Sequence, residues 1–144
     1  GLEMDKETVW QSIWQKVEND GQSSLNKYER IWLNVDGLIG DVSGGGLISF
    51  FYNHGADNYK ETIEDLETIG AESAITLVNN IGSMFPDGSP PINIEERNEI
   101  IDSWDHDELN EFLENLDEQF YAIIDDLENK LEPVIEEAIK LANK

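Results

Sequence analysis

Carboxylates are the commonest side chains in this sequence that could do chemistry, and they are densest between residues 107 and 129. The stretch "DELNEFLENLDEQFYAIIDDLEN" holds nine carboxylates and no lysine or arginine. Carboxylates act as general acids and bases, as ligands for hard cations, or as charges that attract a basic partner. These carboxylates are too numerous and too similar for an acid–base pair to be identified among them, so we assign no catalytic residues. The pattern favours a charged surface.

The segment "SWDHDE" at residues 103–108 is the best candidate for a metal site. Asp105, His106, Asp107 and Glu108 are all of metal-ligating types, and an enzyme or metal-binding domain built on them is one hypothesis for the chain. The segment lacks the glycine and the ligand spacing of an EF-hand loop, and the other histidine, His54, is distant in sequence. Asp105 and Glu108 have capping-box spacing. We therefore expect helix capping, no metal and no cofactor.

Two other chemical motifs are incomplete. The glycine-rich "VSGGG" at residues 42–46 precedes Leu47-Ile48, whereas a phosphate-binding loop continues with lysine and then serine or threonine. A nucleophile elbow needs glycine two residues before the serine, where this chain has Asp41. The chain has no cysteine and thus no thiol nucleophile or disulfide. We expect a protein that is not an enzyme.

The net charge of −23 restricts the choice of partner. It arises from 9 basic and 32 acidic residues, a balance that argues against binding nucleic acid or an anionic membrane directly. Between Glu61 and Glu128 the chain has 20 acidic residues and one basic residue, Arg97, whereas the remainder has 12 acidic and 8 basic residues. This asymmetry favours a directed negative field and a basic partner. A solvated acidic surface that only keeps the protein soluble is the simpler alternative.

The elements that position these carboxylates are predicted to be helices. Apolar residues recur at helical spacing in at least six segments, and alternation typical of strands is nearly absent. Breaks are predicted at Gly21, in "DVSGGG" at residues 41–46, at Gly70 and at Pro86. Ser23 or Ser24 is the expected N-cap of the second helix, and Asn93 begins a helix near 94–104. We predict an all-α, single compact domain over residues 1–144, with about six to eight amphipathic helices.

The long acidic helix in the C-terminal half has two opposite faces. Eight apolar residues fall within an arc of roughly 120°: Leu109, Phe112, Leu113, Leu116, Phe120, Ile123, Ile124 and Leu127. The predicted partner-binding residues lie opposite: Asp107, Glu111, Glu114, Glu118, Asp125 and Glu128. Glu108, Asp117 and Asp126 flank them. Nine carboxylates over 22 residues give roughly one charge per 3.7 Å of helix, close to the roughly 3.4 Å of a DNA strand. Pro133 allows a kink or a new helix.

The core is expected to contain the large aromatic residues and the apolar side of this helix. We expect six side chains to be largely buried: Trp10, Trp14, Trp32, Phe112, Leu116 and Phe120. No apolar run approaches the roughly 20 residues of a membrane span, and no signal peptide is visible. A cytoplasmic protein without a membrane partner is therefore expected.

Residues 41–71 contain three short groups of residues that together have the pattern of a known family: Val42, Gly45 and Gly46, then Phe51 and Asn53, then Ile69, Gly70 and Ala71. The pattern, Glu-Val-Asn-Asn-Gly-Gly-Phe, then Gln-Tyr-Phe-x-Asn, then Ile-Gly-Ala, resembles that of a bacterial helical family that contains the DMP-type DNA-mimic proteins. The departures are Asp41, Ser43, Gly44, Leu47, Ser49 and Phe50. "LDEQFY" at residues 116–121 is similar to a second family motif. The resemblance covers about residues 25–141 and implies a helical fold.

The resemblance also implies a function. An acidic surface of such a protein occupies the basic site of a DNA-binding protein, for example a transcription factor, with carboxylates in place of phosphates. The alternative is an immunity-type or regulatory module that neutralises a basic toxin or nuclease. The sequence is compatible with either a monomer or a homodimer.

Overall fold

The computed structural model describes residues 3–144, which fold into helices and contain no strand. The α-helices are α1 (Lys6–Asp20), α2 (Lys27–Gly45), α3 (Leu47–Tyr52), α4 (Tyr59–Thr68), α5 (Glu72–Gly82), α6 (Ile94–Asp102) and α7 (His106–Ala142). Three short 3₁₀ turns connect them: η1 (Gln22–Ser24), η2 (His54–Asn58) and η3 (Pro86–Gly88). The prediction of an all-α domain with a long acidic C-terminal helix is confirmed.

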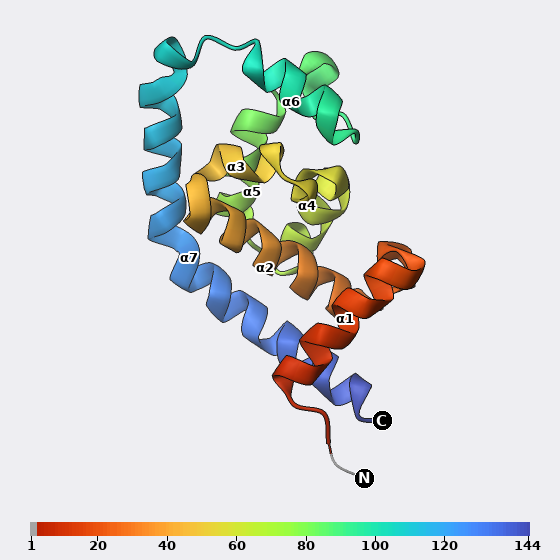
Figure 1. Cartoon of the computed structure of the whole chain (residues 1–144). Coiled ribbons are helices and arrows are strands. Elements are labelled where there is room, and N and C mark those ends of the chain that lie inside the picture. Colours follow the sequence, from red (N-terminus) through yellow and green to blue (C-terminus); the bar gives the residue numbers. More distant parts are fainter. Residues whose placement is uncertain (1–2) are drawn as a thin grey trace.

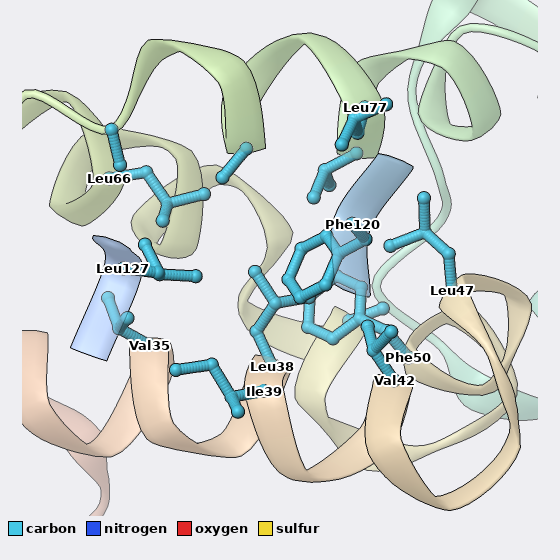
Figure 2. Packing of buried hydrophobic residues seen from close by; sticks show 14 of the residues in the cluster. Val35, Leu38, Ile39, Val42, Leu47, Phe50, Leu66, Leu77, Phe120 and Leu127 are labelled. Atoms are coloured by element: carbon cyan, nitrogen blue, oxygen red, sulfur yellow. The ribbon is translucent and has the colours of Figure 1, made fainter. Parts of the chain in front are cut away.

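Helix α2 lies at the centre of the fold. It packs against α7, α3 and α4, and α7 runs along one edge of the molecule from near α6 to near α1 (Figure 1). Apolar side chains from five helices meet between α2 and α7 (Figure 2): Val35, Leu38, Ile39, Val42, Leu47, Phe50, Leu66, Leu77, Phe120 and Leu127. Each fully buried Leu or Phe stabilises the fold by about 2 kcal/mol. This core fixes which face of α7 is turned to solvent.

The start of α2 corrects one sequence prediction. Asn26, not Ser23 or Ser24, is its N-cap, and its side chain accepts a hydrogen bond from the Glu29 backbone N–H at 2.9 Å. The Glu29 carboxylate in turn accepts from the Asn26 N–H at 2.9 Å, which completes a capping box. Ser23 and Ser24 lie in η1 instead. The Glu29 side chain is buried and paired with Lys16 at 2.7 Å, so this carboxylate is part of the fold.

The junction between α2 and α3 needs a glycine and a carboxylate from α7. Gly46 has a φ of +83°, a conformation that side chains disfavour. A Cβ there would also lie 2.6 Å from Oδ2 of Asp117. Asp117 Oδ1 accepts the Leu47 N–H at 2.8 Å, and thus caps the N-terminus of α3 from another helix. The break predicted within residues 41–46 therefore lies at Gly46.

Helix α7 continues through Pro133 as one helix of 37 residues. Proline lacks the N–H that would donate to the carbonyl four residues earlier, yet the flanking turns remain helical here. The apolar side of α7 is buried at Leu116, Phe120 and Leu127. The C-terminal part lies beneath α2 and reaches α1, whereas the N-terminal part extends toward α6 (Figure 1).

Three of the six side chains that were predicted to be largely buried are more exposed than expected. Trp32, Leu116 and Phe120 are buried as expected, but Trp14 is 48% exposed and Phe112 is 40% exposed. Trp10 is only partly buried and packs against the core from its edge. Phe112 and Trp14 are exposed because no other element of the fold covers their side chains. Phe112 lies on the correct side of α7, but it precedes the turns that pack against the core, and Trp14 faces an open groove.

Candidate functional site

The six predicted binding carboxylates share one exposed face of α7. Asp107, Glu111, Glu114, Glu118, Asp125 and Glu128 are all exposed. None of them forms an ion pair with a cation of residues 3–144. The buried turns around Leu116, Phe120 and Leu127 fix this orientation, because residues on opposite sides of a helix cannot both face the core. The helix therefore presents six uncompensated negative charges to solvent.

The flanking carboxylates have structural contacts. Asp117 caps α3, as described above. Asp126 accepts a hydrogen bond from Lys130 at 2.8 Å, one turn along the same helix. The cross-helix role of Asp117 was missed by the sequence analysis. A signal was present in the sequence, because Gly46 precedes "LISFFY" and glycine has no side chain with which to cap the helix itself.

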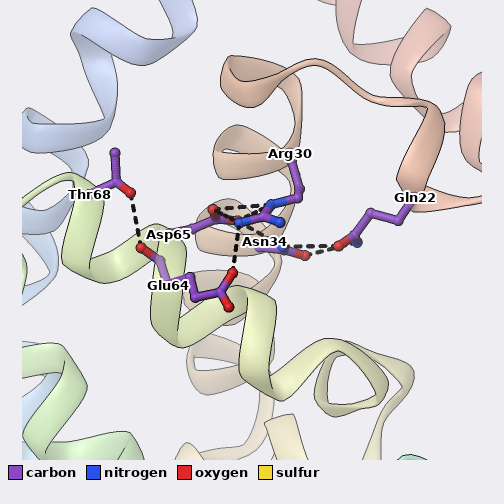
Figure 3. A network of polar contacts seen from close by, with 6 residues as sticks. All are labelled: Gln22, Arg30, Asn34, Glu64, Asp65 and Thr68. Carbon is purple, nitrogen blue, oxygen red and sulfur yellow. Dashed lines mark hydrogen bonds and ion pairs between the residues drawn. The ribbon is translucent and has the colours of Figure 1, made fainter.

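The acidic residues of α4 are partly committed to the fold. Asp65 is 2% exposed and accepts a bidentate contact from Arg30, with Nη2 to Oδ1 at 2.7 Å and Nε to Oδ2 at 3.2 Å (Figure 3). Its Oδ2 accepts from Asn34 Nδ2 at 2.9 Å. Gln22 closes this chain of polar contacts by pairing with the Asn34 amide. Glu64 also meets Arg30, at 3.4 Å. This network joins η1, α2 and α4 and makes α4 a weaker candidate surface than α7.

Helix α6 carries exposed carboxylates at Glu95, Glu96 and Glu99. Asp102, at its end, accepts a hydrogen bond from the Tyr52 hydroxyl at 2.9 Å. Burial, together with this hydrogen bond, raises the pKa of Tyr52 to about 12. Asp102 is therefore part of a contact between α3 and α6.

Arg97 is the one basic residue between Glu61 and Glu128, and its guanidinium group is buried. Its side chain is fully buried and donates to four backbone carbonyls, those of Phe51, Pro91, Ile92 and Asn53. Its Nη2 also lies 2.9 Å from Asp57 Oδ1, so the Asp57 carboxylate balances the charge of the guanidinium. The field around α6 and α7 is set by the exposed carboxylates.

The "SWDHDE" segment forms a helix start. Asp105 is the N-cap of α7 and accepts the Glu108 N–H at 3.2 Å, which confirms the capping prediction. His106 Nε2 lies 2.8 Å from the carbonyl oxygen of Ile101. Over residues 3–144 there is no group of three or more side chains placed to hold a metal ion. No helix in the same range is both long enough and apolar enough to cross a membrane.

Comparison with known proteins identifies the family. No curated protein and no solved structure matches the chain. The family model described as "DMP19-like protein" matches residues 23–138, which include α2 to α6 and most of α7. The match contains both motifs on which the resemblance was based, at residues 41–71 and 116–121. The chain belongs to the DMP19-like protein family.

Proposed function

We propose that this protein is a DNA mimic that binds a basic nucleic-acid-binding protein through the exposed face of α7. The observation that carries the proposal is the set of six exposed carboxylates, Asp107, Glu111, Glu114, Glu118, Asp125 and Glu128, which have no cation partner among the described residues. A protein that binds DNA phosphates carries lysines and arginines in its binding site. These cations can pair with the carboxylates of α7 instead. The proposed activity is binding and requires no catalysis.

The spacing along the helix supports phosphate imitation. Glu111, Glu118 and Asp125 are seven residues apart, and so are Asp107 and Glu114. Seven residues advance an α-helix by about 10.5 Å, and three nucleotide steps advance a DNA strand by about 10.2 Å. Seven residues also complete nearly two full turns, so carboxylates at this interval stay on one face. A row of basic side chains spaced for a DNA strand can therefore meet these carboxylates in register.

Phe112 adds an apolar element at the border of this surface. It is 40% exposed and lies beside Glu111 in the part of α7 that extends past the core. DNA-binding proteins also make apolar contacts, for example to the thymine methyl group at the base edges. An interface that uses Phe112 gains hydrophobic burial in addition to charge attraction.

The test begins with capture of the partner by affinity chromatography. The decisive variant replaces Glu111, Glu114 and Glu118 with glutamine. We expect association with the captured partner to slow by about tenfold, because complementary fields mainly accelerate encounter. Competition with the partner's own DNA should weaken in parallel. The dependence of affinity on salt should also become shallower, since exposed charges are screened over about 8 Å at physiological ionic strength.

A matched control separates this surface from net charge. Glu7, Glu18 and Asp20 are exposed carboxylates of α1, and their replacement by the corresponding amides changes the net charge equally. We expect this control to associate within about twofold of the unmodified protein. Equal slowing by both variants, or unchanged binding in a folded α7 variant, would contradict the assignment. If the captured partner is a toxin or nuclease that loses activity on binding, the immunity-type function replaces DNA mimicry on the same surface.

A further inference from the structure

We propose a second binding site, a groove between α1, α2 and η2 that receives an arginine side chain from a segment of a basic partner protein. The groove has a volume of about 470 Å³ and a mainly apolar lining. Trp14 and Val17 of α1 and Leu33 and Gly37 of α2 lie along it, with Asp41 as a charged neighbour. None of the carboxylates of the α7 face lines it. The site therefore does not depend on the proposed DNA mimicry.

Trp14 gives the groove an aromatic wall. Its side chain is 48% exposed, although it also makes an edge-on contact with Trp10, with ring centroids 6.0 Å apart. An exposed indole next to an apolar groove is a favourable surface for a guanidinium group, which is planar, weakly hydrated and attracted to aromatic faces. The aliphatic stem of the arginine would lie along the apolar lining.

Asp41 supplies the matching charge. This carboxylate is partly buried and accepts one hydrogen bond, from Asn53 Nδ2 at 3.0 Å. It has no cationic partner in the part of the chain that the structure describes. Burial raises the pKa of the Asp41 carboxyl, and an entering cation would favour its charged form. Asp57, the other carboxylate of the groove, already lies 2.9 Å from Arg97 Nη2.

Gly37 keeps the groove open. A glycine inside a helix costs about 1 kcal/mol relative to alanine. A Cβ at Gly37 would meet no atom within 4 Å, so packing within this chain does not require the glycine. Gly37 is exposed, lines the groove and lies about 160° around α2 from the buried Val35, so a longer side chain there would project into the groove. The absence of a side chain at Gly37 leaves this part of the groove open to an occupant.

Charge complementarity selects the occupant. The charged residues that line the groove are Asp41 and Asp57, with His54 as the one neighbouring imidazole. Asp57 already contacts Arg97 and His54, each at 2.9 Å, so Asp41 is the carboxylate of the groove that can pair with an entering cation. The net charge of −23 also attracts cations and repels acidic ligands. Arginine suits the site better than lysine, because its planar group stacks on an indole and pairs with a carboxylate in a fork geometry.

The test uses the full chain and the acetylated, amidated peptide Gly-Ser-Arg-Gly-Ser. Binding is followed by the NMR signal of the Trp14 indole N–H, assigned with a Trp14→Phe variant. The peptide with citrulline in place of arginine has nearly the same shape and no charge. At about 0.15 M salt, where distant charges are screened, we expect the arginine peptide to shift this signal to saturation. The citrulline and lysine peptides should bind at least about threefold more weakly.

Protein variants then locate the site. We expect Gly37→Leu, which fills the groove, and Asp41→Asn, which removes its charge, each to raise the Kd at least about fivefold. The matched controls are Gly44→Leu and Asp36→Asn, which make the same changes on α2 outside the groove and should stay within about twofold. Far-UV spectra verify that each variant is folded.

Two results would overturn the proposal. The first is an indole signal that does not move with millimolar arginine peptide, or that moves equally with the citrulline peptide. The second is binding that is lost when Glu111, Glu114 and Glu118 become glutamine but kept in Gly37→Leu, because the peptide would then be bound by α7. Retained peptide binding in that glutamine variant supports the groove, whatever the outcome of the partner-association experiment.

Discussion

Replacement of the buried Arg97 by methionine is expected to be among the most destabilising single changes in this protein. Arg97 Nε donates to the Phe51 carbonyl at 2.9 Å, and Nη2 donates to the Asn53 carbonyl at 2.7 Å. Its Nη1 donates to the carbonyls of Pro91 and Ile92 at 3.1 and 2.8 Å. One side chain thus joins the end of α3, the connection before α6, and α6 itself. Methionine fills similar space and donates no hydrogen bond.

The expected cost follows from the groups that are left behind. Four carbonyls lose a charged donor, and Asp57 loses the cation 2.9 Å from its Oδ1. Each buried unsatisfied polar group costs about 1–3 kcal/mol, but water can reach those at the edge of the site, such as Asp57, whose side chain is 31% exposed. Removing one partner of a buried ion pair typically costs about 3–5 kcal/mol. We expect the free energy of unfolding to fall by about 4 kcal/mol for Arg97→Met. For Arg97→Lys we expect about half of that loss, because lysine keeps the charge but lacks the planar set of N–H donors of the guanidinium.

Urea unfolding, followed by circular dichroism and by tryptophan fluorescence, measures this loss. A loss of 4 kcal/mol should also lower the Tm by roughly 8–16 °C for a chain of this size. Lys60→Met is the matched control, because Lys60 is exposed, forms no ion pair within residues 3–144, and carries the same charge. Its effect should stay within about 0.5 kcal/mol. An Arg97→Met loss below about 1 kcal/mol would refute the reasoning and imply that water replaces the guanidinium.

Two further predictions test the borders of the core and the α3–α6 contact. Phe120→Ala should cost about 3–5 kcal/mol in urea unfolding, whereas Phe112→Ala on the same helix should cost under about 1 kcal/mol, because Phe120 is fully buried and Phe112 is 40% exposed; equal costs would contradict the observed packing. The pKa of Tyr52 is raised to about 12 from the ordinary tyrosine value of 10.0, so the folded state holds this proton more tightly than the unfolded state does. The stabilising effect is therefore present below pH 10 and is lost as the pH rises toward 12. The stability of the unmodified protein relative to Tyr52→Phe should therefore fall over that interval, and a constant difference would show that the hydroxyl does not titrate as described.

The helices were predictable because their signals are local. Apolar spacing and the caps at Asn93 and Asp105 depend only on residues that are close together in the sequence. The structure confirms both caps. The exposure of Trp14 and Phe112 was not predictable in the same way. The angular position of a residue tells which side of a helix it occupies, but another element must cover that side before the residue is buried. Phe112 has the angle of a core residue and lies beyond the turns that the core covers.

The division of the carboxylates into structural and exposed groups also depends on contacts distant in sequence. Asp65 meets Arg30 from 35 residues away, and Asp117 meets Leu47 from 70 residues away. In the sequence both look like ordinary members of acidic helices. By contrast, the exposure of the six-carboxylate face followed from helical geometry, since the face is opposite the apolar stripe that includes the buried Leu116, Phe120 and Leu127.

The acidic face of α7 should show opposite effects on stability and on binding. Four pairs of its carboxylates lie three or four residues apart: Asp107–Glu111, Glu111–Glu114, Glu114–Glu118 and Asp125–Glu128. Like charges at these intervals destabilise a helix by about 0.2–0.5 kcal/mol each, or about 1–2 kcal/mol together. Burial of Leu116, Phe120 and Leu127 contributes about 6 kcal/mol, so the fold tolerates the repulsion.

Replacing Glu111, Glu114 and Glu118 with glutamine removes three of those pairs. Thermal or urea unfolding should then show a gain of about 0.5–1.5 kcal/mol, while association with the basic partner slows. A gain in stability together with a loss of binding is what a surface retained for its function should show. If the variant is instead less stable, these carboxylates support the fold, and the self-repelling face of α7 needs an explanation within the molecule.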